Sequence, residues 1–285
     1  MVSIFARCLG SPRVLVALTM VLVIAGCAIF ADYLAPHDPG EQNLLSILTP
    51  PIWQIGADPN YPLGTDSLGR DVLSRLIYGA RTALLVAFFA SLGAMVLGTI
   101  LGHLSGYFGG AVDWVIGRAV DVWMSFPPVI LSLILMVGLG IGLRNVIVAI
   151  VLVDWTRFCR VLRSEVLVVT RNDYVAAARL LGFTHWQTIV REVLPATLPL
   201  LITLVSLEMA IAVVVEAILS FVGLGVGANQ PAWGQMIADA RQYVYQSPWN
   251  LLLPIFSIFL TVTAFNLLGD GLRRTLDVRI VEMAR

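Results

Sequence analysis

The sequence predicts an all-α integral membrane protein with about six transmembrane helices. The chain has 285 residues, of which 58% are hydrophobic and only 13% are charged. A soluble domain carries roughly 25% charged residues, so about half of the usual charge is missing. Apolar runs near the length of about 20 residues that a spanning helix needs recur along the chain, and polar segments rich in proline and glycine separate them.

Six apolar runs define the expected spans. Pro36 and Pro39 stop the first run, and Pro127-Pro128 interrupts the third. The fourth contains Asp154 and Arg157, which can pair at i, i+3 and so lower the cost of a charge at that depth. The expected spans cover residues 14–31, 82–104, 117–139, 146–161, 198–222 and 251–268.

The distribution of arginine predicts the orientation. All 18 basic residues are Arg, and if the N-terminus is cytoplasmic then 13 lie at or near the inside and five outside. Both termini are then cytoplasmic. Residues 1–35 form an N-terminal cytoplasmic segment and the first helix, and residues 36–80 form an extracytoplasmic loop. Residues 81–285 form the core domain, with a cytoplasmic loop at 166–195 and an extracytoplasmic loop at 223–250.

Composition and motifs argue against several function classes. The formal net charge is zero, so nucleic-acid binding is not indicated. The chain has no glycine-rich phosphate loop and no nucleophile–base pair, so we expect no catalytic residue, no cofactor and no enzyme activity. The histidines and cysteines lack metal-ligand spacing, and Cys27 is read as a small residue in a helix rather than a lipid-attachment site. These residues are His37, His103, His185, Cys8, Cys27 and Cys159.

The longest polar stretch in the second half, residues 173–195, predicts two short helices. Asn172 or Asp173 is a plausible N-cap for a helix that runs through Leu181. Gly182 suits the left-handed position that ends a helix. Thr184 is expected to cap the next helix, with Gln187 completing a capping box.

The second short helix carries Trp186, Ile189, Val190 and Val193 on its apolar side, and Leu194-Pro195 is expected to end it. This stripe must be buried against something. One interpretation is packing against the chain's own spans or against lipid headgroups. The other is a knob that enters the groove of a soluble partner. The residues alone leave both open.

Acidic residues in the fifth run are candidates for a functional role. A carboxylate deep in a bilayer usually faces a bundle interior or a watery path. Glu216, together with Ser220, is assigned to a translocation path or subunit interface, with a locally paired structural acid as the alternative. Glu208 is a further candidate, although it lies nearer the cytoplasmic end, where water would hydrate it. A relay of Asp154, Glu208 and Glu216 would instead suit a self-sufficient, ion-coupled secondary transporter.

Other polar and aromatic residues have simpler interpretations. Asp66 and Arg70 are expected to form a structural pair rather than a substrate contact, and an exposed pair of that kind adds at most about 1 kcal/mol. The arginines spaced by three in the fourth run are expected to reach lipid phosphates, or else an ATPase or the loop 166–195. An external aromatic belt is expected. The arginines are Arg157, Arg160 and Arg163, and the belt comprises Trp233, Tyr243, Tyr245 and Trp249.

The stretch DYVAAARLLGFTHWQTIVREVLP at 173–195 resembles the EAA loop of binding-protein-dependent ABC importer permeases. Ala177, Ala178, Gly182 and Leu194-Pro195 match that pattern, whereas Ala176 stands where the family usually has Glu. The resemblance implies that this loop contacts a separate ATP-hydrolysing subunit. The residues that it assigns to this coupling loop are Ala176, Ala177, Ala178, Gly182, Thr184, Trp186, Arg191, Leu194 and Pro195.

The resemblance extends along nearly the whole chain to the second permease subunit of dipeptide, oligopeptide and nickel importers. It implies the permease core fold in a bacterial inner membrane and half of a path for peptides or a related small solute. The implied partners are a second homologous permease, two ATP-binding subunits, an extracytoplasmic solute-binding protein and membrane lipid. The further matching stretches are PLGTDSLGRDVLSRLIYGAR, GYFGGAVDWVIGRAVDVWMSFP, WTRFCRVLRSEVL, EAILSFVGLGV, PAWGQMI and NLLGDGLRRTLDVR.

Overall fold

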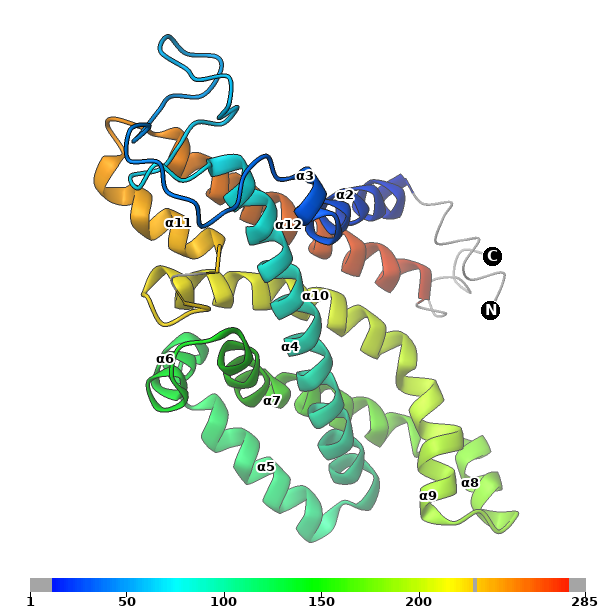
Figure 1. The fold of residues 1–285 in the computed structure, drawn as a ribbon. Coiled ribbons are helices and arrows are strands. Elements are labelled where there is room, and N and C mark those ends of the chain that lie inside the picture. The colour runs from blue at the N-terminus through cyan, green and yellow to red at the C-terminus, as the bar shows by residue number, and fades with distance from the viewer. Residues whose placement is uncertain (1–11, 228–229, 277–285) are drawn as a thin grey trace.

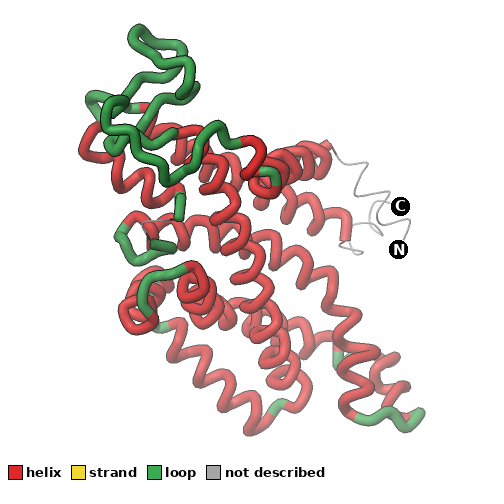
Figure 2. Tube along the Cα trace, viewed as in Figure 1, coloured by secondary structure: helices red, strands yellow, loops and turns green. Residues whose placement is uncertain are grey.

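The computed structural model describes residues 12–227 and 230–276, and over these residues it is helical, with no strand longer than the single bridge between Thr65 and Asp71. Figure 2 shows that the longest loop, residues 35–71, projects from one end of the helical bundle. The predicted cytoplasmic termini, like Cys8, fall outside the described residues.

After the first loop the helices follow one another with short connections, apart from residues 222–232 between α10 and α11. Two short segments depart from α-helical geometry, one π-helical before α10 and one 3-10 after α11. The elements are α2 (Pro12–Ile29), α3 (Ala31–Leu34), α4 (Val72–Phe108), α5 (Gly110–Met124), α6 (Pro128–Leu139), α7 (Leu143–Val169), α8 (Asp173–Leu180), α9 (His185–Thr188), the π-helical turn Ile189–Val193, α10 (Leu194–Phe221), α11 (Trp233–Ala240), the 3-10 turn Arg241–Tyr243 and α12 (Trp249–Leu276).

Four helices of the described chain are long and apolar enough to cross a membrane, and α5 with α6 makes a fifth if that bent pair is one span. The four are α2, α4, the continuous run His185–Phe221 and α12 up to Arg274. The remaining predicted span, 146–161, lies inside α7. That helix is long enough, at 27 residues, but it carries Asp154 near its middle and three arginines in the turns that follow. Each of the six expected runs is therefore helical, and α7 is the polar one.

The third predicted span is broken, as Pro127-Pro128 indicated. Helices α5 and α6 meet at 90° across the break between Met124 and Pro128. Pro128 begins α6, where the missing N–H of a proline costs no helical hydrogen bond. Pro127 has an extended ψ of 127°, because the residue before a proline avoids the helical region. The proline pair thus turns one apolar run into two helices.

Helix α4 is the central element of the bundle, and Figure 1 shows it running the length of the molecule. One side of α4 packs in a core with α6, α7 and α10 that includes Val86, Ile150 and Leu219. Another side packs in a second core with α2, α10, α11 and α12 that includes Val213 and Phe265. Because α4 and α10 belong to both cores, the two halves of the chain form one packed unit.

The contact between α4 and α7 depends on three glycines spaced by four, a signal that the apolar runs did not reveal. A methyl group added at Gly98 would lie 2.5 Å from the carbonyl oxygen of Trp155. At Gly102 and Gly106, the added methyl would lie 2.9 Å from carbonyl oxygens one and two turns further along α7. Small residues at this spacing let two membrane helices approach until their backbones touch.

Replacing Gly98 by Ala is expected to destabilise the protein by about 1–3 kcal/mol, because the added methyl forces α4 away from α7. The measurement is the free energy of unfolding in detergent micelles. Gly26 in α2 is the matched control, because an added methyl there meets no atom within 4 Å. Gly26→Ala should be neutral or stabilising by up to about 1 kcal/mol. Equal effects at both positions would contradict close packing at this seam.

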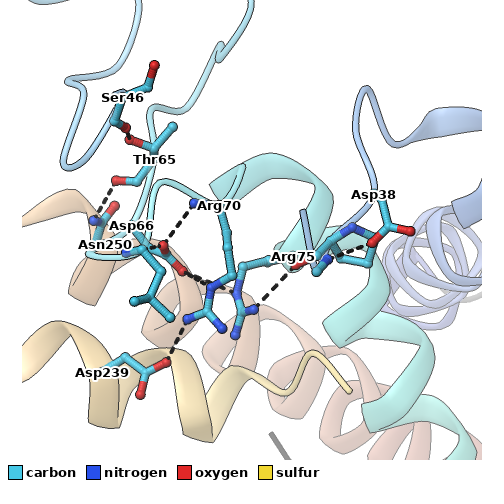
Figure 3. A network of polar contacts seen from close by, with 11 residues as sticks. Asp38, Ser46, Thr65, Asp66, Arg70, Arg75, Asp239 and Asn250 are labelled. Carbon is cyan, nitrogen blue, oxygen red and sulfur yellow. Dashed lines mark hydrogen bonds and ion pairs between the residues drawn. The ribbon is translucent and has the colours of Figure 1, made fainter. Parts of the chain in front are cut away.

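A buried ionic network fixes the loop of residues 35–71 to the C-terminal half of the chain (Figure 3). The Arg70 guanidinium donates to Asp66, with an Nε–Oδ2 distance of 2.6 Å, and to Asp239 of α11 at 3.1 Å. The Arg75 Nε lies 3.6 Å from the same Asp66 oxygen. The predicted Asp66–Arg70 pair is confirmed, but it is largely buried rather than exposed, since the loop and α11 cover it.

Further contacts hold the same loop against α11 and α12. The Asn250 side chain donates to the Thr65 carbonyl at 3.0 Å (Figure 3). Trp233 is buried, and its indole N–H donates to the Leu76 carbonyl at 3.0 Å. The expectation that Trp233 belongs to an external aromatic belt is therefore wrong, because Gly79 leaves room for its ring against α4. The segments predicted to be extracytoplasmic thus meet at one end of the molecule.

Candidate functional site

The polar segment 173–195 lies at the end of the bundle opposite the loop of residues 35–71 (Figure 1). It contains α8, a turn at Gly182, α9 and the π-helical turn that leads into α10. The C-terminal residues of α4 and α7 support it. This placement agrees with the predicted arrangement, in which the coupling loop and the loop of residues 36–80 face opposite sides of the membrane.

Helix α8 and the turn after it have the predicted form. Asn172 is the N-cap residue, with extended backbone and without a side-chain hydrogen bond to the helix. Gly182 has a φ of +90°, which favours glycine. Ala178 is buried, whereas Ala176 and Ala177 are exposed. A carboxylate at position 176 would be solvent-exposed in this chain, so its replacement by alanine leaves no buried group unpaired.

The predicted capping box at α9 is confirmed. The Thr184 hydroxyl accepts from the Gln187 backbone N–H at 3.3 Å, and the Gln187 side chain accepts from the Thr184 N–H at 2.9 Å. Two backbone donors at the start of α9 are therefore satisfied within the segment. Arg191 lies over the Phe183 ring, 5.9 Å from its centroid. These contacts give the turn after Gly182 a defined shape without help from another chain.

The expectation that Leu194-Pro195 ends the second helix is wrong. Residues Ile189–Val193 form a π-helical turn that continues directly into α10. Pro195 lies in the first turn of α10, where the hydrogen-bond pattern changes from i→i−5 to i→i−4 and a missing N–H costs least. Leu194 is half-buried against the core that contains Phe158 and Leu201. Helix α9, the π-helical turn and α10 therefore form one continuous helical run, His185–Phe221.

One face of the segment packs against the chain itself. Val175 of α8 and Val193 of the π-helical turn are fully buried against Val166 and Val169 of α7. Burying a valine side chain contributes roughly 1.5–3 kcal/mol, so these contacts seat the segment on α7. The ring of Tyr107, at the end of α4, covers the same cluster.

Aromatic residues at the end of α4 hold the segment from the other side. The Tyr107 hydroxyl lies 3.1 Å from the His185 Nδ1, and the Arg179 guanidinium lies 4.9 Å from the centroid of the Tyr107 ring. Phe108 lies edge-on to Trp186 with their centroids 6.5 Å apart. Tyr107 and Phe108 were not predicted as site residues. The sequence did offer a signal for them, because two adjacent aromatic residues follow the apolar run at the predicted cytoplasmic boundary.

The opposite face of the segment is apolar and exposed. Leu180 is 88% exposed, Leu181 is 81% exposed and Trp186 is 63% exposed, and Val190 extends this face. The expectation that Trp186, Ile189, Val190 and Val193 form one apolar side is therefore only half right. Only Ile189 and Val193 turn inward, because the turn is π-helical and changes the angular spacing. We name the exposed residues Leu180, Leu181, Trp186 and Val190 the knob.

Replacing Gly182 by Ala is expected to loosen the knob without a steric clash, because an added methyl meets no atom within 4 Å. The substitution destabilises the turn because the left-handed backbone conformation costs a residue with a Cβ about 1–2 kcal/mol of free energy. Amide hydrogen exchange in α8 should become about 5- to 30-fold faster. Gly182→Asn is the control, since Asn tolerates positive φ and should change exchange less. Unchanged exchange in Gly182→Ala would contradict the strain argument.

The candidate acid Glu208 is part of a buried ionic group between α10 and α7. Its Oε2 accepts from Arg157 at 2.9 Å, and Arg157 also lies 3.4 Å from Asp154, which confirms the predicted i, i+3 pair. Glu208 is 2% exposed. The expectation that water hydrates Glu208 is therefore wrong. The helix turns this carboxylate towards α7, where it shares the Arg157 guanidinium with Asp154.

Glu216 and Ser220 form a separate pair within α10. Both are buried, and the Ser220 hydroxyl donates to Glu216 at 2.6 Å. In this chain Glu216 is thus locally paired, as the structural alternative proposed. Glu208 and Glu216 contact different partners, so the three acids do not line up as the relay that an ion-coupled transporter would need.

The arginines of α7 find acidic partners within the chain. Arg160 lies 3.3 Å from Asp121 of α5. Arg163 makes two hydrogen bonds to Asp113 of α5, one of them at 2.6 Å, and Asp113 also accepts from Ser105. The expected contacts of these arginines were lipid phosphates, an ATPase or the loop 166–195, and the carboxylates of α5 are partners that the sequence did not reveal.

This architecture defines a class of protein. The helical bundle and the sequence matches together identify an ABC importer permease, a multi-pass protein of the inner membrane. The chain belongs to the family of binding-protein-dependent transport system inner membrane components, whose model matches residues 94–282. Residues 3–51 match the N-terminal TM domain of oligopeptide transport permease C.

Curated relatives cover nearly the whole chain. The di/tripeptide transport system permease protein DppC of Pseudomonas aeruginosa is 39% identical over 94% of this chain and 88% of its own length. The nickel transport system permease protein NikC of Escherichia coli is 38% identical over 93% and 94%. The glutathione transport system permease protein GsiD of Pectobacterium atrosepticum is 36% identical over 91% and 85%.

Solved structures share the fold at lower identity. An inward-facing structure of the MetNI methionine ABC transporter matches with a TM-score of 0.59 and 20% identity, covering 72% of this chain and 97% of the matched chain. An amino acid ABC transporter matches with a TM-score of 0.55 and 16% identity, covering 71% and 94%. The predicted permease fold is therefore confirmed.

Proposed function

We propose that this permease forms half of the translocation path for a peptide or a related small solute, and that ATP-binding subunits drive it through the knob. The observation that carries the proposal is an exposed apolar face on a segment held rigidly by its own chain. The knob would dock in a groove of the ATPase subunit, as an amphipathic helix docks in a hydrophobic groove.

The continuity of the π-helical turn with α10 supports a mechanical role for the knob. A displacement of α9 would pass directly into α10, which packs against α4, α7 and α12. Closure of the ATPase subunits would thus tilt the helices that border the path. The sites for ATP would lie on the partners, so this chain would need no cofactor and no catalytic residue.

We infer the remaining partners from the family. A second, homologous permease would complete the path, and two ATP-binding subunits and an extracytoplasmic solute-binding protein would complete the importer. The relatives named for di- and tripeptides, glutathione and nickel support a small peptide or a comparable solute. The loop of residues 35–71, which contacts with α11 and α12 hold in place, lies at the end that the binding protein would approach.

Affinity purification of the tagged chain in mild detergent tests this assembly. The expected result is recovery of a second permease and of an ATP-binding subunit, and ATP hydrolysis that increases when a solute-loaded binding protein is added. Transport by the chain alone, driven by a proton or sodium gradient, would contradict the proposal.

A further inference from the structure

A charged cleft lies along the contact between α5 and α7, away from the knob. It has a volume of about 290 Å³ and is lined by residues of the end of α4, residues 113–121 of α5 and residues 159–163 of α7. Neither the ionic group around Glu208 nor the knob uses it. The residues that give the cleft its chemistry are Trp114, Arg118, Asp121, Arg160 and Arg163.

The cleft carries an excess of positive charge. Arg163 is neutralised by Asp113, whereas Arg118 and Arg160 share the single carboxylate of Asp121, at 2.9 and 3.3 Å. A guanidinium has five N–H donors. The ion pairs to Asp121 therefore leave most donors of Arg118 and Arg160 for another acceptor, and both side chains are at least half exposed.

One side of the cleft is apolar. Trp114 is 67% exposed, and Ile116 and Val120 line the cleft beside it. An exposed Trp next to arginines is typical of the boundary between headgroups and acyl chains. The cleft is therefore amphipathic, with guanidinium groups on one side and an aromatic surface on the other.

The depth of the cleft matches that boundary. Arg118 lies eight residues after the start of α5, and Arg160 lies nine residues before the end of α7. At 1.5 Å per residue, both lie roughly 12–14 Å from the helix ends near the knob. The predicted orientation makes this the cytoplasmic side, where anionic lipids give the leaflet a negative potential.

We propose that the cleft between α5 and α7 binds the headgroup phosphate of an anionic phospholipid of the inner leaflet. Arg118 and Arg160 donate to the phosphate oxygens, and the acyl chains lie along Trp114. A phosphate accepts hydrogen bonds from several guanidinium N–H groups at once. A lipid fits better than free phosphate, because only a lipid also covers the exposed Trp114.

Native mass spectrometry of the full chain, purified with its associated subunits, tests the proposal. The probes are phosphatidylglycerol and phosphatidylcholine at equal mole fraction. The wild type should retain phosphatidylglycerol preferentially, and the double variant Arg118→Gln/Arg160→Gln should retain at least about fivefold less. Arg118→Lys/Arg160→Lys should retain an intermediate or wild-type amount. Arg144→Gln, which changes an exposed arginine at the other end of α7, should have no effect.

A second measurement keeps the proposal testable if the double variant does not fold. Brominated phosphatidylglycerol should quench more tryptophan fluorescence in the wild type than in Trp114→Phe, and brominated phosphatidylcholine should not produce that difference. Equal retention of the two lipids, or unchanged retention in the glutamine double variant, would overturn the proposal. Displacement of phosphatidylglycerol by an excess of inorganic phosphate alone would identify a phosphate site instead of a lipid site.

Discussion

Replacing Leu180, Leu181 and Trp186 together by serine is expected to abolish solute-stimulated ATP hydrolysis by the assembled importer. These side chains are 63–88% exposed, so their removal leaves the core of this chain intact. Truncating a Trp that is an interface hot spot costs about 2 kcal/mol or more, and each buried leucine side chain adds roughly 1.5–3 kcal/mol. The affinity of the permease for its ATPase subunit should therefore fall by at least about 100-fold.

The control for this triple variant is a set of equally exposed apolar residues at the other end of the molecule. Leu44, Leu45 and Ile55 are 67–103% exposed in the loop of residues 35–71. Their replacement by serine should leave co-purification of the ATPase subunit unchanged. Loss of the ATPase subunit from both triple variants would show that exposed apolar surface in general, and not the knob, holds the complex together.

Replacing Arg157 by Leu is expected to reduce the free energy of unfolding by about 3 kcal/mol. Two buried carboxylates, Asp154 and Glu208, would lose the only cation within 4 Å among the described residues. Leaving a buried charge unpaired costs about 3–5 kcal/mol, and the partial exposure of Arg157 favours the lower end. Unfolding of the purified protein in detergent micelles measures the change.

Two variants separate this effect from a general loss of charge. Arg160→Leu removes an arginine one turn along α7 whose partner Asp121 is half exposed, and it should cost less than about 1 kcal/mol. Adding Asp154→Asn and Glu208→Gln to Arg157→Leu should restore most of the lost stability, because no buried charge then remains. A triple variant as unstable as Arg157→Leu would contradict the ionic explanation.

Much of the fold could be predicted because apolar runs and helix-ending residues are local signals. Pro127-Pro128, Gly182 and the pair Thr184–Gln187 each act through backbone geometry within a few residues, and each acts as predicted. The spacing of Gly98, Gly102 and Gly106 is also local. Its meaning depends on which helix lies opposite, and hydrophobicity alone does not supply that information.

The candidate site was less predictable where contacts between distant segments decide it. Glu208 is shielded from water because α7 packs against it. Its partner Arg157 lies 51 residues away in the sequence. Trp186 is exposed whereas Ile189, three residues later, is buried, and a π-helical turn begins at Ile189 where an α-helix was expected. Pro195 does not end a helix, because it follows the π-helical turn directly. At that position, where the hydrogen-bond pattern changes, the absence of its N–H costs least. None of these outcomes follows from a propensity of the single residue.

Photo-cross-linking from the knob tests most directly whether this segment contacts the ATPase. p-Benzoylphenylalanine placed at position 181, which is exposed and makes no contribution to the core, should cross-link to the ATP-binding subunit on irradiation of the assembled importer. The same probe at position 45, in the loop at the opposite end, should not. Absence of a cross-link from position 181, or an equal cross-link from position 45, would contradict the assignment of the knob as the coupling surface.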